Sequence, residues 1–365
     1  MLTQERAPAL VIIPTTPRLS YAMMGSYALC TLFTVVCTKS VQHLLSILYG
    51  RQNCKTPLLR FITHRMFLVD SLHQAIHTAP SIEGPWTYNG ALLPEGSSID
   101  LPGNQDLWVS RLKQRQECPY IFFGEWRSHH DVYQAPDVVY SDGNYYVYYS
   151  VSTFGVANSA IGVAVSSDME SGTWTDLGAT GVQSSDGSTD YNAIDAAVFQ
   201  DGNTWVMYFG SWWSGLFAVD MQSPPTAVAE GSAPVNVIQE PVTTAVEAPY
   251  LYKHSSSDYF MFYSQGRCCG YDEDMPPPGE EYKIMVCKSS SAYGPFVDSS
   301  GVSCLEGGGT VVLESHGFVY GAGHQGIFND PTLGPVSSDQ SSKLPRPSAN
   351  LSMTRFYIIT TWTPT

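Results

Sequence analysis

The chain has 365 residues with a formal net charge of −15, and only 14% of its residues are charged. This acidic balance argues against nucleic acids and anionic membrane surfaces as partners, because both require basic patches. The 22 tyrosines, 31 glycines and 12% aromatic residues favour a protein rich in strands and turns over a helical one.

The N-terminal region, residues 1–79, differs in character from the rest of the chain. Residues 21–37, YAMMGSYALCTLFTVVC, are mostly apolar and are preceded by Arg18, but no small-residue cleavage site follows them. We therefore interpret this stretch as either a hydrophobic membrane anchor or a buried segment.

Three segments in the middle of the chain repeat one pattern. APDVVYSDGNYYVYYSVS begins at residue 135, AIDAAVFQDGNTWVMYFGSW at 193 and AVEAPYLYKHSSSDYFMFYSQG at 245. Each has an acid at its third position, then an apolar strand, a polar turn and a strand of alternating aromatic residues. The turns SDGN and QDGN contain Asp-Gly, which favours a tight hairpin. The three acids are Asp137, Asp195 and Glu247.

A second sub-repeat follows these hairpins. AIGVAVSSDMESGTWTD resembles YKIMVCKSSSAYGPFVD at 282–298, and SHGFVYGAGHQGIFND from residue 315 starts like one more unit. Each unit offers roughly four strands in about 50 residues, which is typical of a β-propeller. Because the innermost strand of every blade lines the central channel, we expect the repeated acids to meet in one pocket on the propeller axis.

Eight cysteines are present, and none of them forms a CxxC pair or a Cys/His zinc pattern. Four of them lie within 37 residues and can be either disulfide-bonded or free thiols, with Cys268–Cys269 as an unusual vicinal pair. These four are Cys268, Cys269, Cys287 and Cys304.

Several motifs in order make the chain resemble glycoside hydrolase family 43, and the endo-1,5-α-L-arabinanases within it. They include SIEGPWT, LPEGSSIDLPGNQDLW, APDVVYSDGNYYVYYSVSTFGVANSAIGVAVSS, YNAID, AVEAPYLY, CCGYD, GEEYKIMVCKS and GGGTVVLESHG, within residues 80–108 and 135–336. The resemblance implies an all-β, five-bladed β-propeller spanning 80–336, with its first and last blades incomplete or altered. It also implies a secreted, monomeric glycosidase that hydrolyses arabinan, a pectin side chain, with inversion. No cofactor is required for this reaction, although a structural calcium or other ion in the channel is expected as an option.

The resemblance assigns roles residue by residue. Glu247 in AVEAPYLY matches the general acid, which protonates the leaving glycosidic oxygen, and Asp195 in YNAID matches the carboxylate that orients the acid and modulates its pKa. Asp137 is a support or substrate-contact residue, or else a structural hydrogen-bonding one. His324 matches a histidine that faces a central ion, with a packed core histidine as the alternative. The aromatic candidates for stacking on a furanose polymer are Trp108, Phe154, Tyr191 and Trp212.

The general base of the family is missing from its expected place. In the family it is an aspartate in an HDP-like motif of the first blade, but residues 1–79 contain only Glu5 and Asp70 as acids, and neither lies in such a motif. Asp131, in HHDVYQ, lacks both the proline and the blade context. We therefore assign no residue as the base.

Two further segments depart from the family pattern. Residues 109–134 interrupt the family's DLWAPDV motif with a basic, irregular insert, and residues 337–365 replace the last strands by a Ser- and Pro-rich tail that we expect to be disordered. We attribute these segments, together with residues 1–79, to an imperfect gene model such as retained introns or a wrong start.

Two alternative functions follow from these departures. One is an exo-acting arabinofuranosidase or β-xylosidase on the same fold, which the loops at the channel mouth would decide. The other is an arabinan-binding propeller without activity, because an inverting mechanism that lacks a base cannot activate its water.

Overall fold

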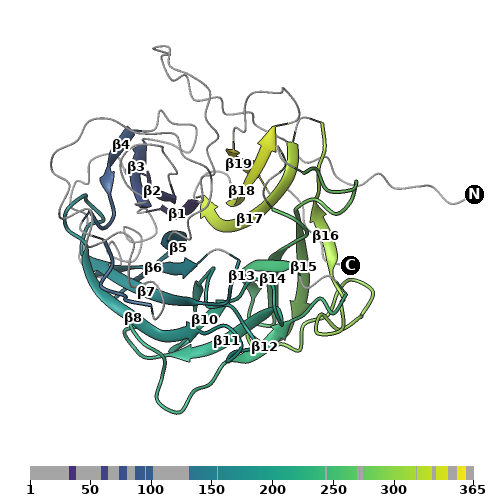
Figure 1. Cartoon of the computed structure of the whole chain (residues 1–365), viewed down its shortest axis with the longest axis horizontal. Coiled ribbons are helices and arrows are strands. Elements are labelled where there is room, and N and C mark those ends of the chain that lie inside the picture. Colours follow the sequence, from purple (N-terminus) through teal and green to yellow (C-terminus); the bar gives the residue numbers. More distant parts are fainter. Residues whose placement is uncertain are drawn as a thin grey trace, which may run out of the picture.

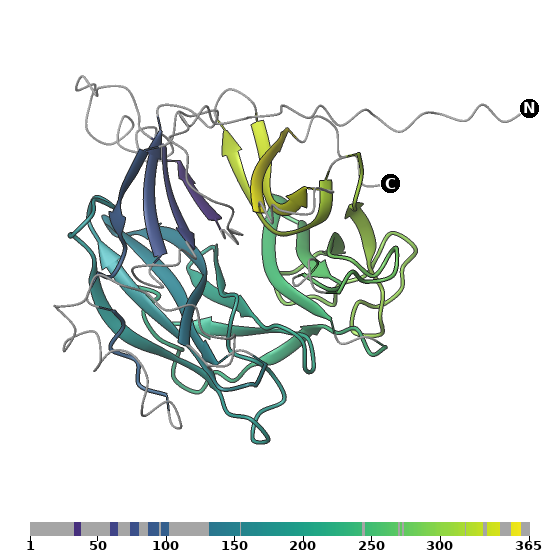
Figure 2. The ribbon, with the colours of Figure 1, turned by 45° about the horizontal axis from the view of Figure 1, so that its top comes forward.

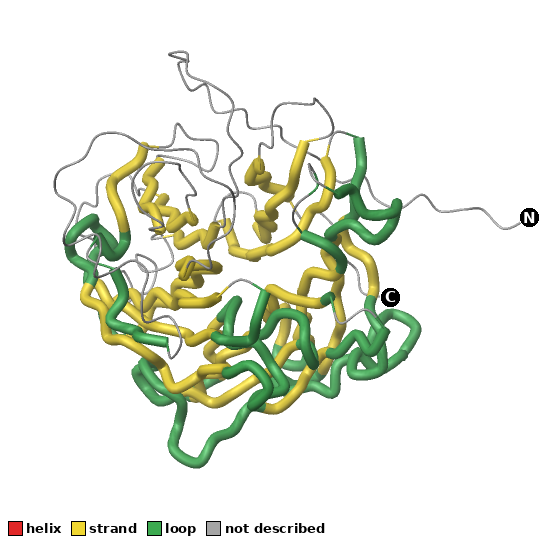
Figure 3. Tube along the Cα trace, in the orientation of Figure 1, coloured by secondary structure: helices red, strands yellow, loops and turns green. Residues whose placement is uncertain are grey.

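The structure is a computed structural model that describes residues 33–37, 59–64, 74–79, 87–94, 96–101, 131–153, 155–242, 245–268, 271, 274–317, 319–330, 334–343 and 352–358. Every regular element within these ranges is a β-strand (Figure 3). The strands form five antiparallel sheets, and each sheet is built from strands that are consecutive in the chain. We call these sheets blades 1 to 5 in chain order.

The first three blades have four strands each. Blade 1 contains β1 (Phe33–Cys37), β2 (Leu59–His64), β3 (Gln74–Ala79) and β4 (Thr87–Ala91). Blade 2 contains β5 (Asp131–Ser141), β6 (Asn144–Thr153), β7 (Ser159–Ser166) and β8 (Thr175–Ser184). Blade 3 contains β9 (Ala197–Asp201), β10 (Thr204–Phe209), β11 (Leu216–Met221) and β12 (Val235–Ile238).

Blade 4 again has four strands, whereas the described part of blade 5 has three. Blade 4 contains β13 (Val246–Ser255), β14 (Asp258–Gln265), β15 (Lys283–Ser289) and β16 (Thr310–Leu313). Blade 5 contains β17 (Val319–Asp330), β18 (Gly334–Lys343) and β19 (Ser352–Ile358).

The blades are arranged as a ring around a central axis (Figures 1 and 2). The first strands contact one another in cyclic order, β1 with β5, β5 with β9, β9 with β13, β13 with β17, and β17 with β1. The predicted five-bladed β-propeller is therefore confirmed. Since the first strand of each blade is the innermost, residues on β5, β9, β13 and β17 are brought together although they are far apart in the sequence.

The hairpins form where the Asp-Gly turns predict them. Ser141 pairs with Asn144, and the two residues between them, Asp142 and Gly143, have φ angles of +49° and +83°. Positive φ at both central positions is the type I′ geometry, whose twist matches that of the strands it joins. This turn fixes the register of β5 against β6.

The core lies between neighbouring blades. Apolar side chains of blades 2 and 3, such as Val163 and Met207, form one buried cluster. Similar clusters lie between blades 1 and 2, blades 3 and 4, and blades 4 and 5. Buried tyrosines keep their hydroxyl groups satisfied by donating to backbone carbonyls of the next blade. Tyr148 donates to Pro225 O and Tyr208 to Ala292 O, at 2.6 and 2.8 Å.

Parts of the segments that depart from the family pattern form strands. Strands β1, β2 and β3 come from residues 1–79, so blade 1 uses residues that precede 80, and β19 and most of β18 come from the tail 337–365. Residues 102–130 lie outside the described residues. The domain limits stay predictions.

The apolar stretch 21–37 ends in strand β1. In the part of the chain that the structure describes, no helix is long and apolar enough to cross a membrane.

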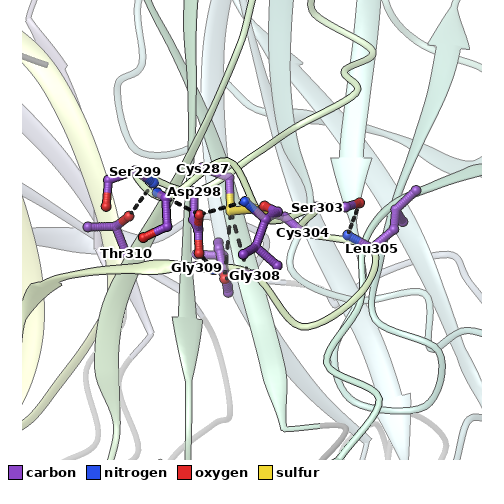
Figure 4. The surroundings of a disulfide bond; sticks show 12 residues. Cys287, Asp298, Ser299, Ser303, Cys304, Leu305, Gly308, Gly309 and Thr310 are labelled. Carbon is purple, nitrogen blue, oxygen red and sulfur yellow. Dashed lines mark hydrogen bonds between the residues drawn. A yellow bond between two sulfur atoms is a disulfide. The ribbon is translucent and has the colours of Figure 1, made fainter. Parts of the chain in front are cut away.

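Of the two states left open for the four clustered cysteines, blade 4 shows a disulfide bond for one pair. Cys287, on β15, is bonded to Cys304, in the loop before β16 (Figure 4). Cys269 lies outside the described residues, so the vicinal Cys268–Cys269 pair stays a prediction.

Candidate active site

The inner strands of blades 2, 4 and 5 share a β-bulge near their first residues. At the bulge, three steps along the inner strand are matched by two steps along its neighbour. The pairs that flank the bulge are Gln134–Ser150 and Asp137–Tyr148 in blade 2, Glu247–Ser264 and Tyr250–Phe262 in blade 4, and Gly323–Gln340 and Gly326–Ser338 in blade 5. Asp137 therefore lies after the bulge and Glu247 before it, although the sequence repeat aligns them.

Asp195 occupies a third position. It has a φ of +60°, and Ala248 and His324, which follow the bulge-flanking residues of blades 4 and 5, have φ angles of +54° and +47°. Asp195 thus matches the residue after Glu247, not Glu247 itself. The alignment of the three acids is wrong by one residue or more, because a bulge changes which residues face the channel.

Glu247 is half-buried near the start of β13, and both of its carboxylate oxygens accept hydrogen bonds. The Ser211 hydroxyl donates to Oε2 at 2.7 Å and the Tyr282 hydroxyl donates to Oε1 at 2.6 Å. The backbone N–H of Trp212 donates to Val246 O at 2.8 Å. The chain that leaves β10 is therefore paired with the start of β13 beside the acid.

Asp195 is buried under the same region, with 7% of its surface exposed. Its Oδ2 accepts a hydrogen bond of 3.2 Å from the backbone N–H of Ala248, and its own N–H donates to Ser150 Oγ at 3.2 Å. Burial raises the pKa of Asp195 well above its usual range, the charge of Glu247 raises this pKa further, and the Ala248 N–H partly opposes both.

Asp195 and Glu247 form a coupled pair of carboxyl groups. The negative charge of Glu247 acts on the buried Asp195 carboxyl and favours its protonated form, so the two groups interact electrostatically across the interface of blades 3 and 4. The two predicted acids thus lie near one another, and their catalytic roles stay predictions.

Asp137 has a different environment, deeper along the inner strand. It is buried, and its Oδ2 accepts a hydrogen bond of 2.7 Å from the backbone N–H of Val198 in blade 3. Burial raises the pKa of Asp137 to about 6, against the opposing effect of the Val198 and Val138 backbone N–H groups. Among its two predicted roles, these contacts favour the structural one, a link between the inner strands of blades 2 and 3.

His324 lies on β17 where blade 5 contacts blade 4. Its backbone N–H donates to Ser264 Oγ at 2.7 Å, and burial lowers the pKa of its imidazole to about 4. A neutral imidazole can ligate a metal. However, the described residues contain no group of three or more His, Cys, Asp or Glu side chains that could hold a metal ion. The ion in the channel stays a prediction.

Two of the four predicted aromatic contact residues can be placed. Trp212 is 40% exposed and lies in the segment paired beside Glu247. Tyr191 instead packs edge-on against Phe209, with ring centroids 5.2 Å apart, and against Phe217 at 5.1 Å. Trp212 is thus available to a ligand, whereas Tyr191 mainly supports the core of blade 3.

The remaining predicted contact residues, Trp108 and Phe154, lie outside the described residues.

Sequence reasoning did not single out Ser211 and Tyr282. Tyr282 lies within the quoted motif GEEYKIMVCKS and Ser211 at the end of the second repeat, but a serine or tyrosine there carries no signal of its own. Their role follows only from the folded chain, because Ser211 belongs to blade 3 and the acid it contacts to blade 4.

The described strands of blade 1 contain no carboxylate. Strand β1 reads FTVVC, and β2, β3 and β4 read LRFITH, QAIHTA and TYNGA. In an inverting glycosidase the base and the acid lie about 6.5–9.5 Å apart on opposite sides of the sugar. These strands supply no candidate for the base.

Comparisons with known proteins identify the family and agree with the fold. Residues 122–337 match the family described as glycosyl hydrolases family 43. The chain is 55% identical over 260 residues to a probable arabinan endo-1,5-alpha-L-arabinosidase A of Aspergillus terreus, covering 71% of this chain and 73% of the relative. It is 50% identical over 260 residues to arabinan endo-1,5-alpha-L-arabinosidase A of Aspergillus niger, covering 71% and 72%.

Solved structures share the fold at lower identity. A family 43 endo-arabinanase from Bacillus licheniformis is 24% identical with a TM-score of 0.62, covering 81% of this chain and 89% of that one. Cellvibrio cellulosa alpha-L-arabinanase complexed with arabinohexaose is 20% identical with a TM-score of 0.64, covering 90% and 91%.

Proposed function

The chain belongs to glycosyl hydrolases family 43, and from this premise we propose that it is an endo-acting glycosidase that cleaves internal α-1,5-arabinofuranosidic bonds of arabinan. Relatives at 50–55% identity carry this activity in their names. The observation that supports it most directly is that the charge of Glu247 acts on the buried Asp195 carboxyl in the neighbouring blade, close to the exposed residue Trp212.

In the proposed mechanism Glu247 is the general acid. Its proton passes to the glycosidic oxygen of the leaving sugar while the bond from that oxygen to C1 breaks. A water attacks C1 from the opposite face and gives its proton to a base, so the configuration at C1 is inverted. Asp195 holds the backbone after Glu247 and favours proton retention on the pair, which is the state that the first step requires.

We propose Trp212 as the surface on which a furanose ring stacks. A neutral sugar offers C–H faces to an aromatic ring, and Trp212 is an exposed residue whose backbone is paired with the segment that carries the acid. Asp137 is proposed as a structural residue that links blades 2 and 3, because its carboxylate accepts a hydrogen bond from a backbone N–H of the next blade.

Secretion and a pectin-derived substrate are further parts of the proposal. The Cys287–Cys304 disulfide supports an oxidising compartment, since such bonds are rare in reducing ones. The acidic net charge suits a neutral polysaccharide substrate, and the chain is proposed to act as a monomer.

Digestion of linear arabinan tests the proposal. We expect a ladder of oligosaccharides; arabinose as the sole product would instead support an exo-acting arabinofuranosidase, and activity restricted to xylosides a β-xylosidase. Glu247→Gln is the matched inactive variant, and Glu306→Gln, at an exposed loop position, is the control.

A second candidate function has an observation of its own. Because the described strands of blade 1 contain no acid, the chain would bind arabinan without hydrolysing it if no other carboxylate serves as the base. Binding of arabinohexaose in calorimetry, together with no product after prolonged incubation, would favour this reading over the hydrolase.

A further inference from the structure

Tyr282 and Ser211 both contact the carboxyl group of Glu247 directly. Tyr282 immediately precedes β15, is buried at 4% exposure, and donates to Oε1 of Glu247 at 2.6 Å. Ser211 donates to the other oxygen, Oε2, at 2.7 Å. The two oxygens of one carboxyl group thus have different hydroxyl partners, one from the same blade and one from the preceding blade.

A glycine in blade 5 makes room for this phenol ring. Gly323 on β17 occupies the same position before the bulge that Glu247 occupies on β13. A Cβ atom at Gly323 would lie 2.0 Å from Cε1 of Tyr282, and the φ of Gly323 is not in the left-handed region. Space for Tyr282, and not backbone conformation, is therefore what requires a glycine here.

We propose that Tyr282 is the positioning residue of the general acid, and that it assigns the transferable proton to Oε2 of Glu247 by acting as a fixed donor to Oε1. This inference rests on the proposed glycosidase function. Oε1 accepts a hydrogen bond from the phenol, so it is a poor site for the carboxyl proton. The Ser211 hydroxyl can rotate, so it can accept a hydrogen bond from a protonated Oε2 or donate one to an ionised Oε2. After transfer to the leaving oxygen, both hydroxyls donate to the carboxylate, which is the arrangement described above.

The environment of Tyr282 keeps it a donor. Burial raises the pKa of the phenol well above its usual value, and the negative charge of Glu247 raises it further. The phenol therefore keeps its proton throughout the range in which glycosidases act. A hydrogen bond to a charged group is stronger than one between neutral groups, and its loss can move a titration by about one pH unit.

Tyr282→Phe is the direct test. We expect kcat on arabinan to fall about 10- to 100-fold with less than a twofold change in KM, because binding does not use the phenol. We also expect the alkaline limb of the kcat/KM profile to move up by about one pH unit, because the carboxylate loses a donor that stabilises its charge. A merely structural role would lower stability without moving this limb.

Tyr208→Phe is the matched control, since Tyr208 is also a buried tyrosine whose hydroxyl donates at 2.8 Å, to Ala292 O. Its kcat and pH profile should equal those of the wild type. Gly323→Ala, which forces the Tyr282 ring to move, should shift kcat and the limb in the same direction as Tyr282→Phe. Should Gly323→Ala fail to fold, Tyr282→Phe alone decides.

A readout that does not need activity separates this inference from the proposed function. The infrared band of the protonated Glu247 carboxyl, identified by its loss in Glu247→Gln, should persist to higher pH in Tyr282→Phe than in the wild type. If the wild-type protein leaves arabinan intact, the proposed hydrolase function is refuted. The infrared comparison would still test the role of Tyr282. Unchanged positions of both the band and the alkaline limb would overturn the role of Tyr282.

Discussion

The carboxyl group of Asp195 in blade 3 is hydrogen-bonded to the backbone of blade 4 at Ala248, one residue after Glu247. Asp195 therefore positions the backbone beside the acid, and the charge of Glu247 in turn raises the pKa of Asp195. Because the two residues are attached to different blades, their separation depends on how the blades pack, and not on any local segment of the chain.

Glu247→Gln should abolish proton donation while keeping the shape of the site. Loss of a general acid typically costs 10²- to 10⁴-fold, so we expect kcat on arabinan to fall about 10³-fold with arabinohexaose affinity nearly unchanged. Steady-state kinetics and calorimetry measure the two effects. A variant with more than a tenth of wild-type kcat would exclude Glu247 as the acid.

Asp195→Asn should move the alkaline limb of kcat/KM to lower pH. The amide can still accept from Ala248 N–H, and asparagine tolerates the φ of +60°, but the second carboxyl that favours proton retention on the pair is gone. Asp195→Ala provides the contrast, since alanine tolerates this conformation poorly and cannot accept the bond. An unshifted limb in Asp195→Asn would show that the carboxyl groups do not share a proton.

Asp137→Asn should stabilise the protein relative to the wild type more at neutral pH than in mild acid. The pKa of Asp137 is about 6 in the folded protein against an ordinary 3.8, so the folded state binds the extra proton and wild-type stability falls as pH rises through this range. The displacement corresponds to about 3 kcal/mol. The difference in unfolding free energy between variant and wild type should grow by roughly this amount from pH 4 to 7.5 in urea titrations.

Only the comparison of two curves isolates Asp137. The lowered pKa of His324 makes its contribution rise with pH between about 4 and 6.5, which opposes the contribution of Asp137 in wild-type protein. Subtracting the wild-type curve from that of the variant cancels His324. Asp186→Asn, at an exposed position, should give a difference that does not change with pH, and the same flat result for Asp137→Asn would contradict the prediction.

The sequence was sufficient to predict the inner hairpins of blades 2, 3 and 4. Alternating aromatic strands joined by Asp-Gly turns determine a hairpin locally, and Asp142 and Gly143 indeed adopt the turn conformation that such residues favour. Repetition of that unit leaves few arrangements other than a ring. The family motifs then identified Glu247 and Asp195, whose chemistry depends on residue type as well as on place.

The relative positions of the acids could not be predicted in the same way. A bulge adds one residue to the inner strand without leaving a signature in the sequence, so aligning Asp137, Asp195 and Glu247 by eye placed them at one position that they do not share. Tyr282 was missed for a related reason. Its contact with the acid depends on the absence of a side chain at Gly323, in another blade. The residues next to Tyr282 in the sequence carry no information about that position.

Trp212→Ala should weaken substrate binding more than catalysis. Removing the exposed indole beside Glu247 deprives a furanose ring of its stacking surface, and we expect KM for arabinan to rise about tenfold, or about 1.4 kcal/mol, with kcat changed less than threefold. Tyr88→Ala is the control, because Tyr88 is 50% exposed on β4, far along the blade from the inner strands. Equal KM values for wild type and Trp212→Ala would remove Trp212 from the binding site.

Loss of the Cys287–Cys304 disulfide should destabilise blade 4 without altering the pH profile. The bond joins β15 to the loop before β16 (Figure 4). In this loop the Asp298 carboxylate accepts hydrogen bonds from the backbone N–H groups of Ser300 and Val302. For a sequence separation of 17 residues, the loop-closure model gives about 3 kcal/mol of stabilisation. The double variant Cys287→Ser/Cys304→Ser should therefore unfold at lower urea concentration. Reductant should lower the urea midpoint of the wild type toward that of the variant and leave the midpoint of the variant unchanged. A wild-type midpoint that does not change, although reductant can reach the bond in the unfolded chain, would show that the bond contributes little.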